Sequence, residues 1–206
     1  MYRTKPSVHH FLLIFLISFS WLTSLYSEGL PDDEVKNIIR KSTITRTQEP
    51  FIIHTDRETL EYFMEHVEEL TKHGRDFSKG ELILEAKGNS QYNIHIPSKH
   101  ITGKFQLAEW QPNKVIYQGH GNASTFLKFS GLIVLEVDYL TKDNNTEPSE
   151  QVKTTVHLKF DNAFFALLAK AASPVFVPKL DKFITKFTNK VKNIVETTYT
   201  TRNTPG

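Results

Sequence analysis

The chain has 206 residues, with 25 lysine and arginine and 23 aspartate and glutamate side chains, for a formal net charge of +2. These charges are interspersed, so no field of one sign is available to hold a polyanion, and nucleic acid is not expected as a partner. The sequence contains no cysteine, which excludes disulfides, thiolate metal sites and a lipid-modified cysteine.

Residues 1–27 have the layout of an export signal, with basic residues ahead of an apolar run over 11–19. A spanning helix needs about 20 predominantly apolar residues, and serines interrupt this run, so cleavage is favoured over permanent anchoring. Cleavage after Ser27 places Leu25 where a small residue is preferred, and an uncleaved anchor therefore stays open. We expect an extracytoplasmic protein, periplasmic or secreted, with anchoring through this segment as the alternative.

The remainder suits a single domain with one substantial core. Residues 28–41 are polar and predict a tether or a short capped helix leading into the domain. The domain itself is expected over 42–200, followed by a disordered tail over 201–206.

The first strand is expected between Ser42 and Thr55, where β-branched residues recur. Pro50 within this stretch allows only an edge strand or a bulge. Thr55 or Asp56 can cap a following helix that ends at Gly74. The apolar positions of this helix, at helical spacing, are Leu60, Phe63, Met64, Val67 and Leu70.

After Gly80 the hydrophobic pattern changes to period two and continues to about Asp161, with turn formers between the segments. Successive strands with short connections predict an antiparallel meander. Alternation gives the sheet one covered inner face and one wet outer face. The expected strands are Glu81–Lys87, Gln91–Ile96, Gly103–Trp110, Asn113–Gly119, Phe126–Leu140 and Gln151–Phe160.

The C-terminal part is expected to cover the inner face. Residues 162–172 predict a short helix that is apolar nearly all round, and Ser173 with Pro174 begins a second helix that continues to Tyr199. Replacing Phe183 by Asp is expected to unfold the domain, because an apolar contact becomes a buried charge. The apolar stripe of the second helix is Phe176, Leu180, Phe183, Ile184, Phe187, Val191, Ile194 and Val195.

An edge strand running into a helix, a six-strand meander and a long amphipathic C-terminal helix together resemble the START-like helix-grip superfamily of lipid-transfer, polyketide cyclase and related ligand-binding proteins. Residues 51–58, 101–105 and 111–116 are similar to the opening and the middle strands of such domains. The resemblance implies an α+β fold in which a curved antiparallel sheet grips the long helix, with a cavity for a hydrophobic molecule between them.

We therefore expect a non-enzymatic protein that binds or transports a lipid or another hydrophobic small molecule outside the cytoplasm, with transient membrane contact. The expected gate of the cavity is Phe164, Phe165, Leu167 and Leu168. The expected cavity lining is Tyr92, Phe105, Leu107, Glu109, Tyr117, Leu135, Tyr139, Phe183 and Phe187.

Two alternatives stay open. The first is an exported interaction domain with a filled core, since protein interiors are densely packed. The second, less favoured, is a cyclase-like or dehydratase-like enzyme that uses Glu109 with a tyrosine as acid and base. No nucleophile elbow, phosphate-binding glycine loop or His-Glu metal motif is present, so no catalytic residue, cofactor or metal is assigned. The histidines are expected to be solvated.

Overall fold

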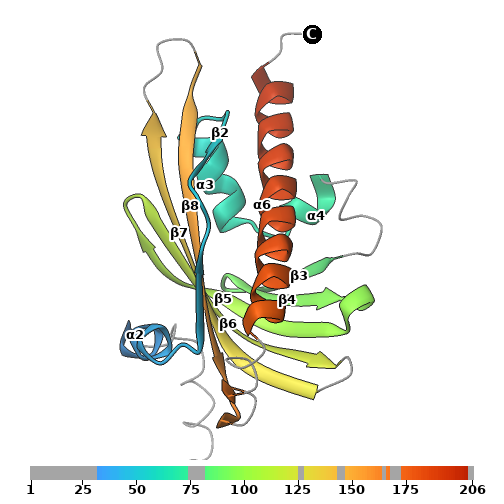
Figure 1. The fold of residues 1–206 in the computed structure, drawn as a ribbon. Coiled ribbons are helices and arrows are strands. Elements are labelled where there is room, and N and C mark those ends of the chain that lie inside the picture. The colour runs from blue at the N-terminus through green and yellow to red at the C-terminus, as the bar shows by residue number, and fades with distance from the viewer. Residues whose placement is uncertain are drawn as a thin grey trace, which may run out of the picture.

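In the computed structural model, the described residues are 32–73, 82–124, 128–142, 147–163, 166–167 and 173–203. A curved eight-stranded antiparallel sheet holds the long helix α6 on its concave side (Figure 1), which confirms the predicted α+β helix-grip arrangement. The expected export signal over 1–27 lies outside the described residues. The elements are α2 (Asp32–Arg40), β1 (Ile44–Thr47), β2 (Phe51–Ile53), α3 (Arg57–Glu65), α4 (Glu69–His73), β3 (Ile83–Gly88), β4 (Gln91–Ile96), η1 (Pro97–Lys99), β5 (Ile101–Gln111), β6 (Lys114–Ser124), β7 (Lys128–Lys142), β8 (Ser149–Phe160) and α6 (Ser173–Asn203).

The strands follow the order β1-β8-β7-β6-β5-β4-β3, and β2 also pairs with β8. The expected first strand is therefore two short edge strands, Ile44–Thr47 and Phe51–Ile53, both antiparallel to β8. Pro50 lies in the break between them, where its missing N–H group costs no ladder hydrogen bond. The edge-strand prediction from this proline is confirmed.

The helix after β2 begins as predicted, because the Asp56 carboxylate accepts a hydrogen bond of 2.8 Å from the backbone N–H of Thr59. The expected single helix is wrong, since α3 ends at Glu65 and a second short helix, α4, begins at Glu69. His66 leaves helical geometry at the break, with φ −115° and ψ 64°. The break allows the two pieces to follow the concave surface of the sheet.

The outer, convex face is more buried than the alternation of polar and apolar residues along the strands predicts. Helix α2, in the segment expected to be a tether or a short capped helix, packs Val35 and Ile38 against Ile116 and Val134 of the sheet. Figure 1 shows α2 on the opposite side of the sheet from α6. The folded domain therefore includes residues 32–40 as well as the expected 42–200. At the other end, α6 continues to Asn203, so residues 201–203 of the expected tail are helical.

A buried polar network lies on the same outer face, and it corrects the expectation that the histidines are solvated. His157 is only 6% exposed. Its Nε2 lies 2.8 Å from Glu136 Oε2, and its Nδ1 lies 3.1 Å from Thr45 Oγ1. Lys114 donates to the other oxygen of Glu136 at 2.5 Å. Burial acts to raise the pKa of Glu136, but the hydrogen bonds from Lys114 and His157 outweigh it and the pKa is lowered. This network ties β6, β7, β8 and β1 together.

At two glycines of the sheet, the backbone of the neighbouring strand approaches too closely for a side chain. A Cβ atom on Gly119 would lie 2.6 Å from the Lys104 carbonyl oxygen, and one on Gly131 would lie 2.7 Å from the Lys159 carbonyl oxygen. Such distances leave no room for a side chain. Glycine at both positions therefore lets the adjacent strands lie closer together than any other residue would allow.

We expect Gly119→Ala to destabilise the domain by about 1–3 kcal/mol, because the new methyl group meets backbone atoms that cannot move aside cheaply. Gly121→Ala is the matched control, since its Cβ would have its nearest neighbours at 3.6 Å and 3.7 Å. Urea unfolding of the two variants beside the parent measures the difference. Equal stability of the two variants would contradict the requirement for glycine at position 119.

Candidate functional site at the inner face of the sheet

Three inner-face tyrosines fix α3 between the sheet and α6. The hydroxyl group of Tyr117 donates to the Met64 carbonyl oxygen, and that of Tyr92 donates to the Glu65 carbonyl oxygen at 2.6 Å. These carbonyls belong to the last turn of α3, where the helix supplies no N–H partner of its own. Tyr92 and Tyr117 therefore cap the end of α3 from the sheet.

The third tyrosine, Tyr139, donates to Glu61 Oε1 at 2.9 Å, and the Arg57 guanidinium lies over its ring at 5.2 Å. Burial is the main cause that raises the pKa of Tyr139 to about 12, with the Glu61 carboxylate adding to it. Burial likewise raises the pKa of Tyr92 and of Tyr117. All three hydroxyl groups are held in their protonated, donating form.

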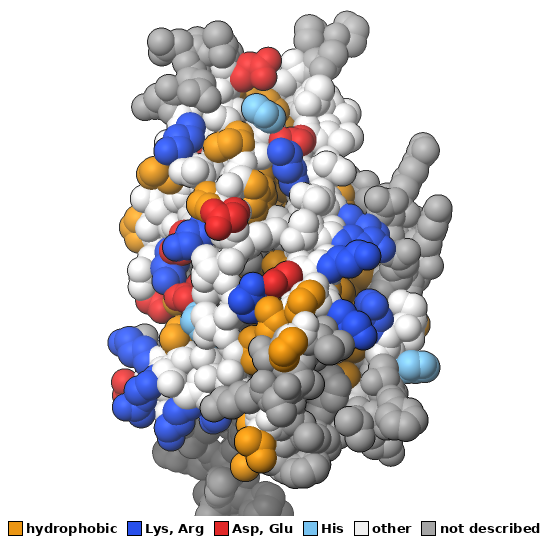
Figure 2. All heavy atoms as spheres, in the orientation of Figure 1, with side chains coloured by type: hydrophobic (Ala, Val, Ile, Leu, Met, Phe, Trp, Pro, Cys, Tyr) orange, Lys and Arg blue, Asp and Glu red, His pale blue; other side chains and the backbone are white. Residues whose placement is uncertain are grey.

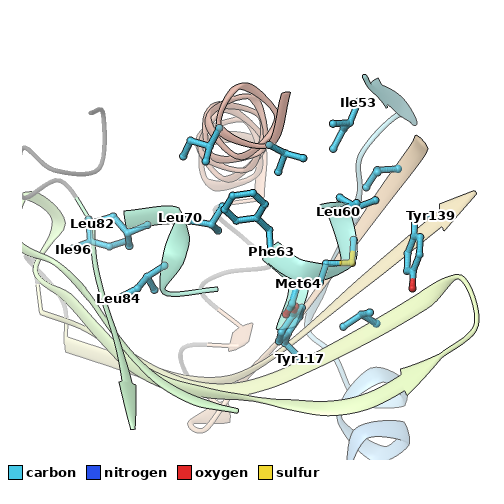
Figure 3. Close-up of a cluster of buried hydrophobic side chains, with 14 residues drawn as sticks. Ile53, Leu60, Phe63, Met64, Leu70, Leu82, Leu84, Ile96, Tyr117 and Tyr139 are labelled. Carbon is cyan, nitrogen blue, oxygen red and sulfur yellow. The ribbon is translucent and has the colours of Figure 1, made fainter. Parts of the chain in front are cut away.

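The space between these tyrosines and the second half of α6 is filled by the protein itself. Figure 3 shows Phe63 and Leu70 pointing toward α6, with Met64 over Tyr117 at the sheet. Val195 of α6 is completely buried in this cluster. The expected cavity does not extend into this half of the inner face.

The other expected lining residues lie around the filled cluster. The ring of Phe105 stacks on that of Tyr92, with centroids 5.0 Å apart. Leu107, Leu135 and Phe187 are only partly buried where they pack against the cluster. Phe105, Leu107 and Leu135 therefore share the inner face of the sheet, as expected, and Phe187 packs against the same cluster from α6.

Glu109 is the exception, because a β-bulge reverses its direction. Leu107 pairs with Tyr117 on the inner face, but the pairing then shifts so that Glu109 faces Ile116, which packs under α2 on the outer face. Gln111 donates a hydrogen bond to the Glu109 carboxylate there. The prediction that Glu109 points inward is wrong, and the acid–base pairing of Glu109 with an inner-face tyrosine is not assembled.

Polar contacts along one side of α6 hold the helix to the edge strands. Arg46 of β1 forms a two-pronged ion pair with Asp181, at 2.7 Å and 2.6 Å. Further along, Thr188 donates to Gln48 Oε1 at 2.9 Å. Nearer the C-terminus, Glu196 Oε1 accepts from the backbone N–H of His54 at 2.9 Å. Residues 181, 188 and 196 fall on one side of the helix. They set its position along β1 and β2.

Sequence reasoning missed Arg46 and Asp181. Arg46 pairs with Val156 of β8, which in turn pairs with Leu135 of β7, so all three share the inner face. The signal that could have found this pair is a basic residue at an inward position of an edge strand, together with an acidic residue among the lysines in the first half of the helix.

The first half of α6 is much less buried than the second. Between Val177 and Phe187 no described side chain is buried, and the first buried residue of the helix among those described is Thr188. Phe183, expected inside the cavity, is 36% exposed. The premise that an aspartate here would be buried is therefore wrong, because the side chain is not enclosed.

The sheet beneath this half of α6 is also partly uncovered. Ile133 lies one inward position beyond Leu135 on β7, toward the start of α6, and it too is 36% exposed. Of the expected gate, Leu167 is 66% exposed and follows the end of β8, whereas Phe164, Phe165 and Leu168 lie outside what the structure describes. Apolar groups of both the sheet and the helical segments thus remain accessible to solvent at this end of the molecule. We define Ile133, Leu167 and Phe183 as the apolar rim.

Two hollows on the described surface lie elsewhere. One, of about 510 Å³, is on the outer face of β3 to β6 and is lined largely by polar side chains such as Asn93, Lys104 and His120. The other, of about 460 Å³, lies beside the turn between β5 and β6, near Pro112 and Tyr139. Neither opens between the sheet and α6.

Within the described ranges, no group of three or more histidine, aspartate or glutamate side chains is placed to hold a metal ion. None of the helices in the part of the chain that the structure covers combines the length and apolar character needed to span a bilayer.

No protein-family model and no curated protein matches the sequence. Solved structures do match the fold. A conserved protein from Geobacillus kaustophilus is 13% identical and superposes with a TM-score of 0.50, over 76% of this chain and 97% of the other. A START superfamily protein from Mycobacterium smegmatis is 13% identical, with a TM-score of 0.45, over 77% and 99% of the two chains. The chain has the α+β helix-grip fold that its sequence pattern predicts, and it shares this fold with the Geobacillus protein.

The capping role of Tyr117 predicts a stability effect. Tyr117→Phe leaves the Met64 carbonyl buried without its donor, and we expect a loss of about 1–3 kcal/mol in the free energy of unfolding. Tyr139→Phe is the comparison, because Glu61 keeps Arg57 as a partner at 2.8 Å and should lose less. Urea unfolding monitored by circular dichroism gives both values. A Tyr117→Phe variant as stable as the parent would show that the hydroxyl group does not hold α3.

Proposed function

We propose that the protein binds a lipid or another hydrophobic small molecule between the inner face of the sheet at Ile133 and the first half of α6. The observation that carries the proposal is the uneven burial of α6. Its apolar stripe is enclosed at Ile194 and Val195 but remains uncovered at Phe183. An apolar molecule that covers the uncovered part gains about 2.5 kcal/mol for each 100 Å² removed from water.

The site is apolar on both sides, which favours binding over catalysis. Inner-face tyrosine hydroxyls that an enzyme could use are hydrogen-bonded to α3, and Glu109 lies on the outer face. Phe164, Phe165 and Leu168, together with the exposed Leu167, are proposed as the gate through which the molecule enters. The filled-core alternative applies to the half of the inner face that α3 occupies.

A matched pair of aspartate substitutions tests the site. Val195 is fully buried, so Val195→Asp should unfold the domain, since an unpaired buried charge costs several kcal/mol. Phe183→Asp should leave a folded protein, because that side chain is 36% exposed, but should weaken binding of a fluorescent fatty-acid probe at least about tenfold. Thermal unfolding and probe titration are measured on the same samples. A parent protein that fails to bind the probe, or a folded Phe183→Asp variant with parental affinity, would favour the filled-core alternative.

The extracytoplasmic location is also proposed, from the serine-interrupted apolar run over 11–19. Protein isolated from its own host is expected to begin close to Glu28, as N-terminal sequencing would show. Material that begins at Met1 would indicate that the segment is retained as an anchor. This result leaves the ligand site unaffected, because the two proposals depend on different residues.

A further inference from the structure

Gly121 lies on the inner face of β6, beside the apolar rim. Alternation along the strand places it on the same face as Tyr117. A Cβ atom at residue 121 would lie 3.7 Å from the Cδ1 atom of Ile133, which is 36% exposed. Gly121 itself is only partly buried. The side-chain position of residue 121 therefore points into the space that we propose for the ligand.

The backbone does not explain a glycine at this position. A glycine inside a strand costs conformational entropy, and it often marks a bulge, a left-handed backbone or the close approach of another group. The pairing of β6 with both neighbouring strands runs through residue 121 without a bulge, and Gly121 does not have a positive φ. Its Cβ would meet no described atom closer than the Thr102 carbonyl oxygen at 3.6 Å, an ordinary contact distance.

The neighbouring glycines of the inner face differ in this respect. A Cβ on Gly119 or Gly131 would lie 2.6 Å or 2.7 Å from a backbone carbonyl oxygen, and one on Gly103 would lie 3.0 Å from another. At these three positions a neighbouring strand takes up the space of a side chain. At Gly121 that space is open among the described residues, and a bound molecule is the remaining kind of group that approaches a strand glycine closely.

The register of the sheet fixes what borders the open position. Gly119, the preceding inward residue of β6, pairs with Phe105 on β5 and with Ile133 on β7. Adjacent strands lie about 4.8 Å apart, so the backbones of β5 and β7 are separated by roughly 9–10 Å. This spacing suits the width of a fused ring system better than that of a single acyl chain. Figure 2 shows hydrophobic side chains at the surface over the lower part of α6, the helix on the other side of this space.

We propose that Gly121 determines the specificity of the ligand site, because it lets a hydrophobic molecule with a flat, fused ring system lie directly on the backbone of β6. This proposal rests on the proposed function, to which it adds the shape of the ligand and the residue that selects it. The ring system lies between Phe105 and Ile133, with α6 over its other face. A side chain at position 121 lifts the rings from the sheet, whereas a flexible chain bends around it.

Two fluorescent probes of equal charge test the proposal: pyrenebutyrate, which has a flat fused ring system, and cis-parinarate, which has a single unbranched chain. We expect the protein to bind pyrenebutyrate. Gly121→Val should weaken that binding at least about tenfold and change the affinity for parinarate by less than about threefold. Asn122→Val is the matched control, because it introduces the same residue at the next, exposed position of β6 and should leave both affinities unchanged.

Gly121→Ala shows whether the position is open, because it adds only a methyl group. Its midpoint of urea unfolding should equal or exceed that of the parent, and its affinity for pyrenebutyrate should fall. A midpoint lowered as far as we expect for Gly119→Ala would show that the protein itself fills the space, and would overturn the proposal.

The two probes also separate this proposal from the ligand site itself. If the parent binds parinarate but not pyrenebutyrate, the role assigned to Gly121 is wrong and the ligand site stands. The same conclusion follows if Gly121→Val weakens both probes equally or weakens neither. If the parent binds neither probe, the proposed function fails, and the specificity role fails with it.

Discussion

The hydrogen bonds from Tyr92 and Tyr117 to the end of α3 are the interactions on which the rest of the arrangement depends. The last carbonyls of a helix have no N–H partner within it, and burying them without donors would be costly. The sheet supplies these donors from its own inner face. Helix α3 can therefore end inside the protein, against the sheet, with α6 on its other side.

This placement divides the inner face into two unequal environments. Where α3 lies, Phe63, Met64 and Leu70 occupy the space between the sheet and α6, and Val195 is completely enclosed. Beyond α3, the ion pair between Arg46 and Asp181 contacts α6 from the side of the edge strands. Both partners are more than a third exposed, so this contact positions the helix more than it stabilises the fold. An enclosed half and a partly uncovered half therefore belong to the same helix.

Much of the architecture could be predicted from local patterns. The period-two segments predict the meander, Pro50 predicts the interrupted edge, and Asp56 predicts the start of α3, because each depends on a few neighbouring residues. The failures are of another kind. His157 lies at a position that alternation assigns to solvent, yet α2 and the edge strands bury the outer face around it. Its burial depends on segments distant in the sequence, which periodicity within β8 does not report.

The candidate site shows the same limit. The inward direction of Tyr92, Phe105 and Leu135 could be predicted from alternation, since register within a regular strand fixes the face of each side chain. The uncovered state of Phe183 could not, because it depends on where α3 stops filling the interior. The hydrophobic stripe of α6 consists of large apolar residues in both its enclosed and its uncovered half. Only the three-dimensional neighbours distinguish them.

The bulge at Ala108 has a consequence for the comparison of related sequences. It absorbs one residue within β5, so that Trp110 still pairs with Val115 and the turn at Pro112 is preserved. A relative with a regular strand here would need an alignment gap inside the strand, at position 108. A gap placed in the adjacent turn, where insertions are usually accommodated, would exchange the inner and outer faces of Glu109 and Trp110. Functional roles transferred through such an alignment would then be assigned to the wrong side of the sheet.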